Sequence, residues 1–218
     1  MLLKGQIRGS PYIGVYAKAN ENIALLPKDC DENSINDIKR SLGVETYLTY
    51  IGGSPIIGSL TVINSHGIIL PDFSDLEDVE FLKNDYNILF LEDKLNAIGN
   101  DILANDKAAL VHEGFSDESL KLIGDILDVE VLKGKIGGIP TVGSVALVTK
   151  NALLVNPQVD DDELKYLSSV FGVPAYIVTA NFGSIFIGAS MIANSKGAYV
   201  GSNSTVVEVS RIEEALNI

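Results

Sequence analysis

Apolar residues along the chain recur in a fixed order, and this order repeats five times. Each repeat has a glycine near its start, within a short apolar stretch: Gly14, Gly58, Gly99, Gly143 and Gly188. Successive glycines lie 44, 41, 44 and 45 residues apart. A sequence period of this length is typical of proteins built from repeated supersecondary units. The pattern therefore predicts five copies of one module.

Within each repeat the pattern predicts two strands joined by a hairpin. A turn-like polar cluster begins six residues after the glycine, at Asn20, Asn64, Asn105, Thr149 and Asn194. Such clusters connect antiparallel strands. We expect the first strand to begin at the glycine. The second strand is almost wholly apolar and is expected over residues 23–26, 68–70, 108–111, 153–155 and 198–200. Prolines follow three of these strands, and proline cannot extend an interior ladder.

A helical period follows each hairpin. Apolar residues recur three or four apart, as at Leu120, Ile123 and Leu127. Helices are expected over residues 34–42, 76–82, 117–127, 161–170 and 206–216. A third strand is expected after the first four helices, over residues 44–51, 88–91, 129–136 and 175–180.

The fifth repeat ends after its helix, at Ile218, and lacks a third strand of its own. The first nine residues supply one, because Gly9 lies five residues before Gly14, as Gly53 does before Gly58. A closed array needs no atypical repeats at its ends. The sequence therefore predicts a single α/β domain, residues 1–218, folded as a closed five-bladed ring of ββαβ modules. The modules cover residues 11–53, 54–94, 95–138, 139–183 and 184–218 with 1–10.

Composition places the chain among globular proteins, because 46% of its 218 residues are hydrophobic and 21% are charged. No apolar stretch approaches the roughly 18 residues of a membrane span. The single cysteine, Cys30, excludes an internal disulfide framework and fits a reducing compartment. We therefore expect a cytoplasmic monomer without a membrane partner.

The net charge of −13 argues against a general nucleic-acid binder. The segments that hold the expected helices contain 22 acidic and 7 basic residues, whereas the rest of the chain contains 7 acidic and 9 basic ones. One interpretation is a solvated helical belt with carboxylates near helix N-termini. The other is a ring whose nearly neutral end approaches a polyanionic surface while the belt repels other contacts.

Candidate catalytic and metal-binding motifs are weak throughout the chain. Cys30 lies between carboxylates that disfavour its thiolate, and the histidines His66 and His112 belong to different repeats. The acidic run 160–163 lacks the alternating ligands and central glycine of a calcium loop, and the glycines of 134–138 lack phosphate-loop spacing. We expect no catalytic residue, metal or cofactor.

Four segments resemble the translation initiation factor 6 family in its archaeal form, and the similarity runs along the whole chain. They are residues 13–18 (IGVYAK), 64–71 (NSHGIILP), 95–100 (LNAIGN) and 105–112 (NDKAALVH). The resemblance implies the pentein fold, which agrees with the closed array predicted from the repeats. It also implies a factor that binds the large ribosomal subunit on its subunit-joining face and sterically prevents premature joining of the small subunit.

For the partner-binding surface we favour Asn100 with the adjoining Gly99, because residues 95–100 match the family closely. Ser59 and Ser144 occupy the same step in neighbouring modules and are further candidates by pseudosymmetry. The hairpin tips form an alternative surface, with Ser65, His66, Lys107, Lys150 and Lys196. A structural role for Asn100, satisfying backbone groups beside Gly99, is the competing interpretation.

The main functional alternative is an enzyme, because the pentein fold also carries guanidine-modifying enzymes with a nucleophilic cysteine, a histidine and carboxylates. This sequence departs from that pattern at Cys30, which is early in the chain and flanked by acids. A nonspecific RNA clamp is a third possibility, and the net charge disfavours it.

Overall fold

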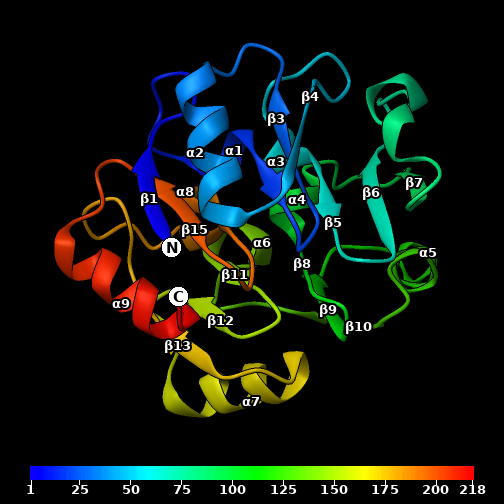
Figure 1. Ribbon diagram of the computed structural model, residues 1–218. Helices are drawn as coiled ribbons and strands as arrows, with labels where there is room; N and C mark the ends of the chain where they lie inside the picture. The colour runs from blue at the N-terminus through cyan, green and yellow to red at the C-terminus, as the bar shows by residue number, and fades with distance from the viewer.

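The computed structural model describes residues 1–218 and contains five three-stranded sheets. Figure 1 shows the sheets following one another in chain order around the middle of the molecule. The central strand of each sheet pairs antiparallel to the strand before it and parallel to the third strand, so every sheet is mixed. This arrangement gives an α/β protein of five similar units.

Each unit begins with a helix of four residues. These short helices are α1 (Ile13–Tyr16), α3 (Ile57–Leu60), α4 (Ile98–Asp101), α6 (Val142–Val145) and α8 (Ile187–Ser190). The expectation that the first strand begins at the repeated glycine is therefore wrong, and each unit is better described as αββαβ. A short apolar run does not distinguish a strand from a buried helical turn. The helical turn brings each glycine against the next unit.

The two strands of each hairpin follow at once. The first strands are short: β2 (Lys18–Ala19), β5 (Val62–Ile63), β8 (Ile102–Ala104), β11 (Ala146–Val148) and β14 (Met191–Ala193). The central strands match the predicted positions: β3 (Ile23–Pro27), β6 (Gly67–Pro71), β9 (Ala108–His112), β12 (Leu153–Val155) and β15 (Ala198–Gly201). Pro27 and Pro71 are the last residues of their strands, where a missing N–H is tolerated.

Four units continue with an eleven-residue helix: α2 (Glu32–Leu42), α5 (Asp117–Leu127), α7 (Asp161–Phe171) and α9 (Val206–Leu216). Each begins after a Ser, Thr or Asp whose side chain accepts hydrogen bonds from the first turn. The helix predicted over residues 76–82 is wrong in kind, because two 3₁₀ helices, η1 (Leu76–Asp78) and η2 (Glu80–Leu82), occupy it. The second unit is the shortest, and the tighter 3₁₀ turns fit its shorter connection.

Third strands complete the sheets: β4 (Glu45–Thr49), β7 (Asn87–Leu91), β10 (Glu130–Gly134) and β13 (Ala175–Ile177). In the fifth unit this place is taken by β1 (Leu2–Gly5), which pairs in parallel with β15. Leu2 and Ile218 pack against the same core cluster, and Figure 1 marks the two termini next to each other. The prediction that the N-terminal strand completes the last sheet is confirmed.

The hydrophobic core consists of five clusters, and each cluster lies between two consecutive units. Ile23 and Leu25 of β3 pack into the core of the second unit, whereas Ala24 and Leu26 pack into the core of their own. Residues of the fifth unit, Ile192 and Tyr199, pack into the core of the first. Because both faces of each central strand are covered, these strands are apolar throughout and do not alternate.

The short helices contact one another in chain order, and α8 contacts α1. The five repeated glycines lie at these contacts. A Cβ atom on Gly58 would overlap the carbonyl oxygen of Gly14, and the same overlap would occur between Gly14 and the carbonyl of Gly188. None of these five glycines has a positive φ. Glycine is therefore required here for close approach of two backbones, not for an unusual conformation.

We expect Gly58→Ala to lower the free energy of unfolding by roughly 3 kcal/mol, because the added methyl group meets rigid backbone that cannot move aside. Urea denaturation measures this change. Gly53→Ala is the matched control. Gly53 has open space around its Cβ position but a φ of +74°, so its substitution should cost only about 1–2 kcal/mol. An equal loss for both variants would contradict the close-approach argument.

Carboxylates at the start of the long helices hold the turns that join neighbouring units. Glu208 in the first turn of α9 accepts hydrogen bonds from the backbone N–H groups of Phe182 and Gly183, at 3.2 and 2.8 Å, and from that of Thr205 at 2.7 Å. Burial alone would raise the pKa of Glu208, but the hydrogen bonds from Thr205 and Gly183 hold it below its usual value. Glu163 binds the N–H of Gly137 in the same way.

Glu208→Gln should therefore lower the free energy of unfolding at pH 7 by roughly 1–3 kcal/mol, because one charged acceptor of several N–H groups is lost. Since the pKa is lower in the folded protein, the carboxylate stabilises the fold above about pH 4 and loses this effect as pH falls further. Urea denaturation should show the difference between wild type and variant shrinking below about pH 4. The exposed Glu214→Gln is the control and should change little.

Candidate functional site

A cavity of about 90 Å³ lies in the middle of the molecule and is lined by residues of all five units. The first strands of the hairpins run along it, so the cavity has two ends. At one end lie the five short helices, which we call the helix end. At the other lie the hairpin turns at residues 20–22, 64–66, 105–107, 149–151 and 194–196, which we call the tip end. The predicted partner-binding residues divide between these ends.

Asn100 lies at the helix end and differs from the other candidates there. It is half-buried on α4, and its side-chain amide makes no hydrogen bond within the protein. Ser59 and Ser144, in contrast, are buried, with 6% and 8% of their surface exposed. The Ser144 hydroxyl donates to the Thr141 carbonyl oxygen at 2.7 Å. Gly99 is buried against the Gly58 carbonyl. Of these four predicted residues, Asn100 alone combines an unpaired polar side chain with a half-exposed position.

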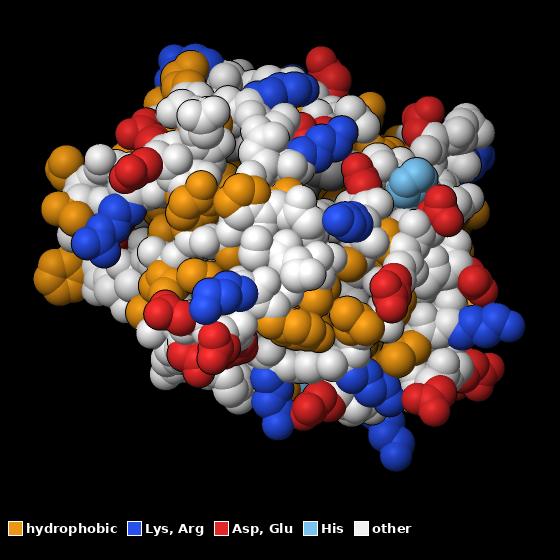
Figure 2. Space-filling view, turned by 90° about the horizontal axis from the view of Figure 1, so that it is seen from below, with side chains coloured by type: hydrophobic (Ala, Val, Ile, Leu, Met, Phe, Trp, Pro, Cys, Tyr) orange, Lys and Arg blue, Asp and Glu red, His pale blue; other side chains and the backbone are white.

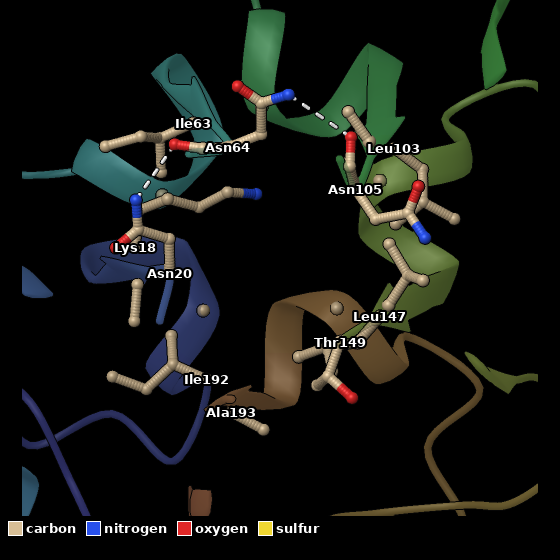
Figure 3. A pocket seen from close by; sticks show the side chains of 18 of the residues that line it. Lys18, Asn20, Ile63, Asn64, Leu103, Asn105, Leu147, Thr149, Ile192 and Ala193 are labelled. Carbon is tan, nitrogen blue, oxygen red and sulfur yellow. Dashed lines mark hydrogen bonds between the residues drawn. The ribbon is translucent and has the colours of Figure 1, made fainter. Parts of the chain in front are cut away.

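The asparagines at the tip end tie the units together. Each side-chain oxygen accepts hydrogen bonds from its own turn, as Asn64 does from the N–H groups of His66 and Gly67. Each side-chain nitrogen donates to the next unit: Asn20 to the Asn64 carbonyl at 2.9 Å, and Asn64 to the carbonyls of Asn105 and Leu127 at 3.3 and 2.7 Å. Figure 3 shows the first two of these links.

Thr149 replaces asparagine in the fourth unit, and its hydroxyl serves only its own turn. Sequence reasoning assigned these five positions to turns and missed their role between units. The recurrence of asparagine at four of these positions is the signal that was available in the sequence. An asparagine amide presents an oxygen acceptor and two N–H donors on separate atoms, so it can bind its own turn and the neighbouring unit at once.

The candidate residues of the tip end differ from one another in exposure and in the hydrogen bonds that they make. His66 is exposed, and Ser65 donates its N–H to the Asp106 carboxylate at 2.8 Å. Lys196 donates to the carbonyls of Glu21 and Gly43, so its ammonium serves the fold. Lys107 and Lys150 are exposed. The structure thus brings Ser65 and His66 together at the tip end, away from Asn100.

Lys18 of β2 points into the cavity, a feature that sequence reasoning did not single out. Figure 3 shows its side chain extending towards the middle of the cavity. Its ammonium makes neither a hydrogen bond nor an ion pair within the protein, and desolvation lowers its pKa to about 8.

The residues considered for catalysis lie apart from the cavity. Cys30 is buried between β3 and α2, in the core of the first unit, and burial followed by the nearby Asp31 carboxylate raises its pKa to about 11. His66 is at a hairpin tip, and His112 ends β9, where its Nδ1 accepts the N–H of Gly114 at 2.9 Å. Neither histidine lines the cavity, and Cys30 does not line it either. No group of three His, Cys, Asp or Glu side chains is arranged to hold a metal ion.

Figure 2 shows one face of the molecule, on which Lys and Arg side chains alternate with Asp and Glu around the periphery. Hydrophobic side chains occupy parts of the middle and protrude at the left edge of this view. The acidic excess of the chain does not form a single negative field on this face. No helix is both long and apolar enough to cross a membrane.

Five similar units around a shared cavity define an α/β repeat protein, and solved structures of the same fold include an enzyme domain. It is the N-terminal domain of ArgZ, an arginine dihydrolase from Cyanobacteria, with a TM-score of 0.50, 15% identity, and coverage of 75% of this chain and 68% of that one. The eIF-6 family model matches residues 2–215, and the chain belongs to this family of translation factors.

Full-length relatives support the same assignment. The chain is 44% identical to translation initiation factor 6 of Thermoplasma acidophilum, over all of both chains. It is 42% identical to translation initiation factor 6 of Methanocaldococcus jannaschii, over 100% of this chain and 99% of the relative. The resemblance found in the four sequence segments is confirmed.

We expect Cys30 to react with iodoacetamide roughly two orders of magnitude more slowly at pH 7 in the folded protein than in urea, because its raised pKa leaves little thiolate. Mass spectrometry measures the rate, which should climb steadily with pH towards 11. Rapid alkylation of the folded protein at pH 7 would contradict this and would revive a nucleophilic role for Cys30.

Proposed function

We propose that the protein binds the large ribosomal subunit on its subunit-joining face and sterically prevents premature association with the small subunit. Membership of a family of translation factors carries this proposal. The proposed mechanism requires no reaction on a substrate. A rigid body occupies the face, and its binding free energy must be lost before the subunits can join.

We infer that the modules, over the residue ranges predicted from the repeats, form one closed five-bladed pentein ring. The contact of α8 with α1 and the pairing of β1 with β15 support closure. The core shared by the fifth and first units supports it as well. A closed ring holds its binding surface rigidly, so little ordering entropy is lost on binding. The proposed working form is a cytoplasmic monomer.

The helix end is the proposed ribosome-binding surface, with Asn100 at its centre. Its free amide is available to a partner, whereas the equivalent Ser59 and Ser144 are buried. Two aromatic side chains, Tyr12 and Phe186, directly precede α1 and α8 and are 38% and 43% exposed. Exposed aromatic side chains are enriched at protein contact surfaces. Gly99 supports this surface by letting α4 pack closely on α3, and Ser59 and Ser144 support it from within.

We also propose that the protein has no catalytic activity of the guanidine-modifying kind. The buried thiol of Cys30 has a raised pKa and lies in the core of the first unit, away from both histidines. Such a thiol is a poor nucleophile. Cys30→Ala should retain full anti-association activity.

The test is co-sedimentation with isolated large and small ribosomal subunits, followed by a subunit-joining assay. Wild type should sediment with the large subunit alone and inhibit joining. Asn100→Arg should weaken binding about tenfold or more, because a longer charged side chain at the centre of the contact prevents close packing. His66→Arg adds the same charge at the tip end and should change binding by less than about twofold.

The two variants separate the alternatives. Loss of binding by His66→Arg with retention by Asn100→Arg would move the contact to the tip end, with Ser65 and His66 at its centre. Equal effects of both variants would indicate a response to added charge and would contradict the assignment to the helix end. Absence of binding by wild type would overturn the ribosomal function itself.

A further inference from the structure

Lys18 is a cation without a partner inside a protein that carries an excess of acidic residues. The six ion pairs of the chain all involve other residues. The Lys18 side chain extends into the cavity from β2, and its ammonium contacts no hydrogen-bond acceptor of the protein (Figure 3). Removing an ammonium group from bulk water without compensation is costly, so this position calls for an explanation.

The other charged residues that line the cavity make no ion pair with Lys18. Both oxygens of Glu21 are engaged by Ser195, through its N–H at 2.9 Å and its hydroxyl at 2.5 Å. Asp106 is exposed and accepts the N–H of Ser65. Lys150 adds a second positive charge, exposed at the tip end. The lining therefore holds two carboxylates and two lysines, and neither carboxylate forms an ion pair with the Lys18 ammonium.

We propose that the central cavity binds a small inorganic oxyanion of the phosphate type, held by the Lys18 ammonium. An ammonium group is a compact charge with three donors, which suits a tetrahedral anion. This site goes beyond ribosome binding and does not depend on it.

The size of the cavity limits the ligand. A cavity of 90 Å³ holds several water molecules, since one water needs roughly 10–15 Å³ of this kind of volume. A free phosphate or sulfate ion fits such a space. The apolar parts of the lining, including Ile63, Leu103 and Leu147, keep the dielectric constant low and strengthen the attraction between the ammonium and an anion.

The experiment compares wild type, Lys18→Met and Lys150→Met in sodium phosphate and in sodium chloride of equal ionic strength at pH 7. Phosphate at about ten times its Kd should raise the Tm of wild type by roughly 3–6 °C. Lys18→Met removes the ammonium but keeps a side chain of similar length, so this variant should lose the phosphate response. In chloride it should melt at a higher temperature than wild type, because it removes a half-buried ammonium that has no partner within the protein.

Lys150→Met is the matched control, because it removes an exposed lysine at the mouth of the same cavity. It should keep the phosphate response. An equal response in all three proteins, or no response in wild type, would overturn the proposal. If Lys18→Met failed to fold, calorimetric titration of wild type with sulfate at different pH values would still test whether Lys18 holds the anion.

Sulfate keeps its charge between pH 6 and pH 10, so any pH dependence of its binding belongs to the protein. The pKa of Lys18 is about 8, and the charged form is present below it. Sulfate should therefore bind at pH 6.5 and lose affinity by about tenfold or more at pH 9.5. Glu21, Asp106 and Lys150 also line the cavity, so the same titration of Lys150→Met separates the contribution of the second lysine from that of Lys18. An affinity independent of pH would overturn the assignment to Lys18.

Discussion

Close approach of the short helices is the constraint on which the rest of this structure depends. At each contact the glycine of one unit lies against the carbonyl of the glycine before it, where even a methyl group has no space. This contact sets the distance between neighbouring units, and the distance fixes which residues of a central strand reach the next core. The fifth unit meets the first by the same contact, so the spacing must hold at every step. One larger side chain would disturb all five units.

The links at the tip end hold the opposite side of the structure at the same spacing. Asparagine amides there join the turns to the neighbouring carbonyls, and buried carboxylates such as Glu208 join the intervening turns to the long helices. Most polar groups near the middle are therefore used by the fold. The Asn100 amide and the Lys18 ammonium are two groups without a partner in the protein, and both line the central cavity. Groups that a rigid frame leaves unpaired are natural candidates for contact with other molecules.

The charged residues are distributed unevenly between the outer helices and the inner part of the structure. The acidic excess belongs to the outer helices, where carboxylates near helix N-termini are stabilised and exposed to water. The inner strands, turns and short helices are nearly neutral. A body with this distribution can approach a negatively charged ribosomal surface by its neutral end, while its periphery disfavours other approaches. The Lys18 ammonium in the cavity lies on this nearly neutral inner side.

The sequence by itself determined the number of units, the positions of their central strands and long helices, and the use of the N-terminal strand in the last sheet. These features follow from local periodicity and from the spacing of glycines, which a single chain displays directly. Only the tertiary structure decided that residues around the glycines form helical turns, that Ser59 and Ser144 are buried, and that asparagines link units. It alone placed Lys18 in the cavity. Each of these depends on distances to a neighbouring unit some 40 residues away in sequence, and local patterns carry no information about such distances.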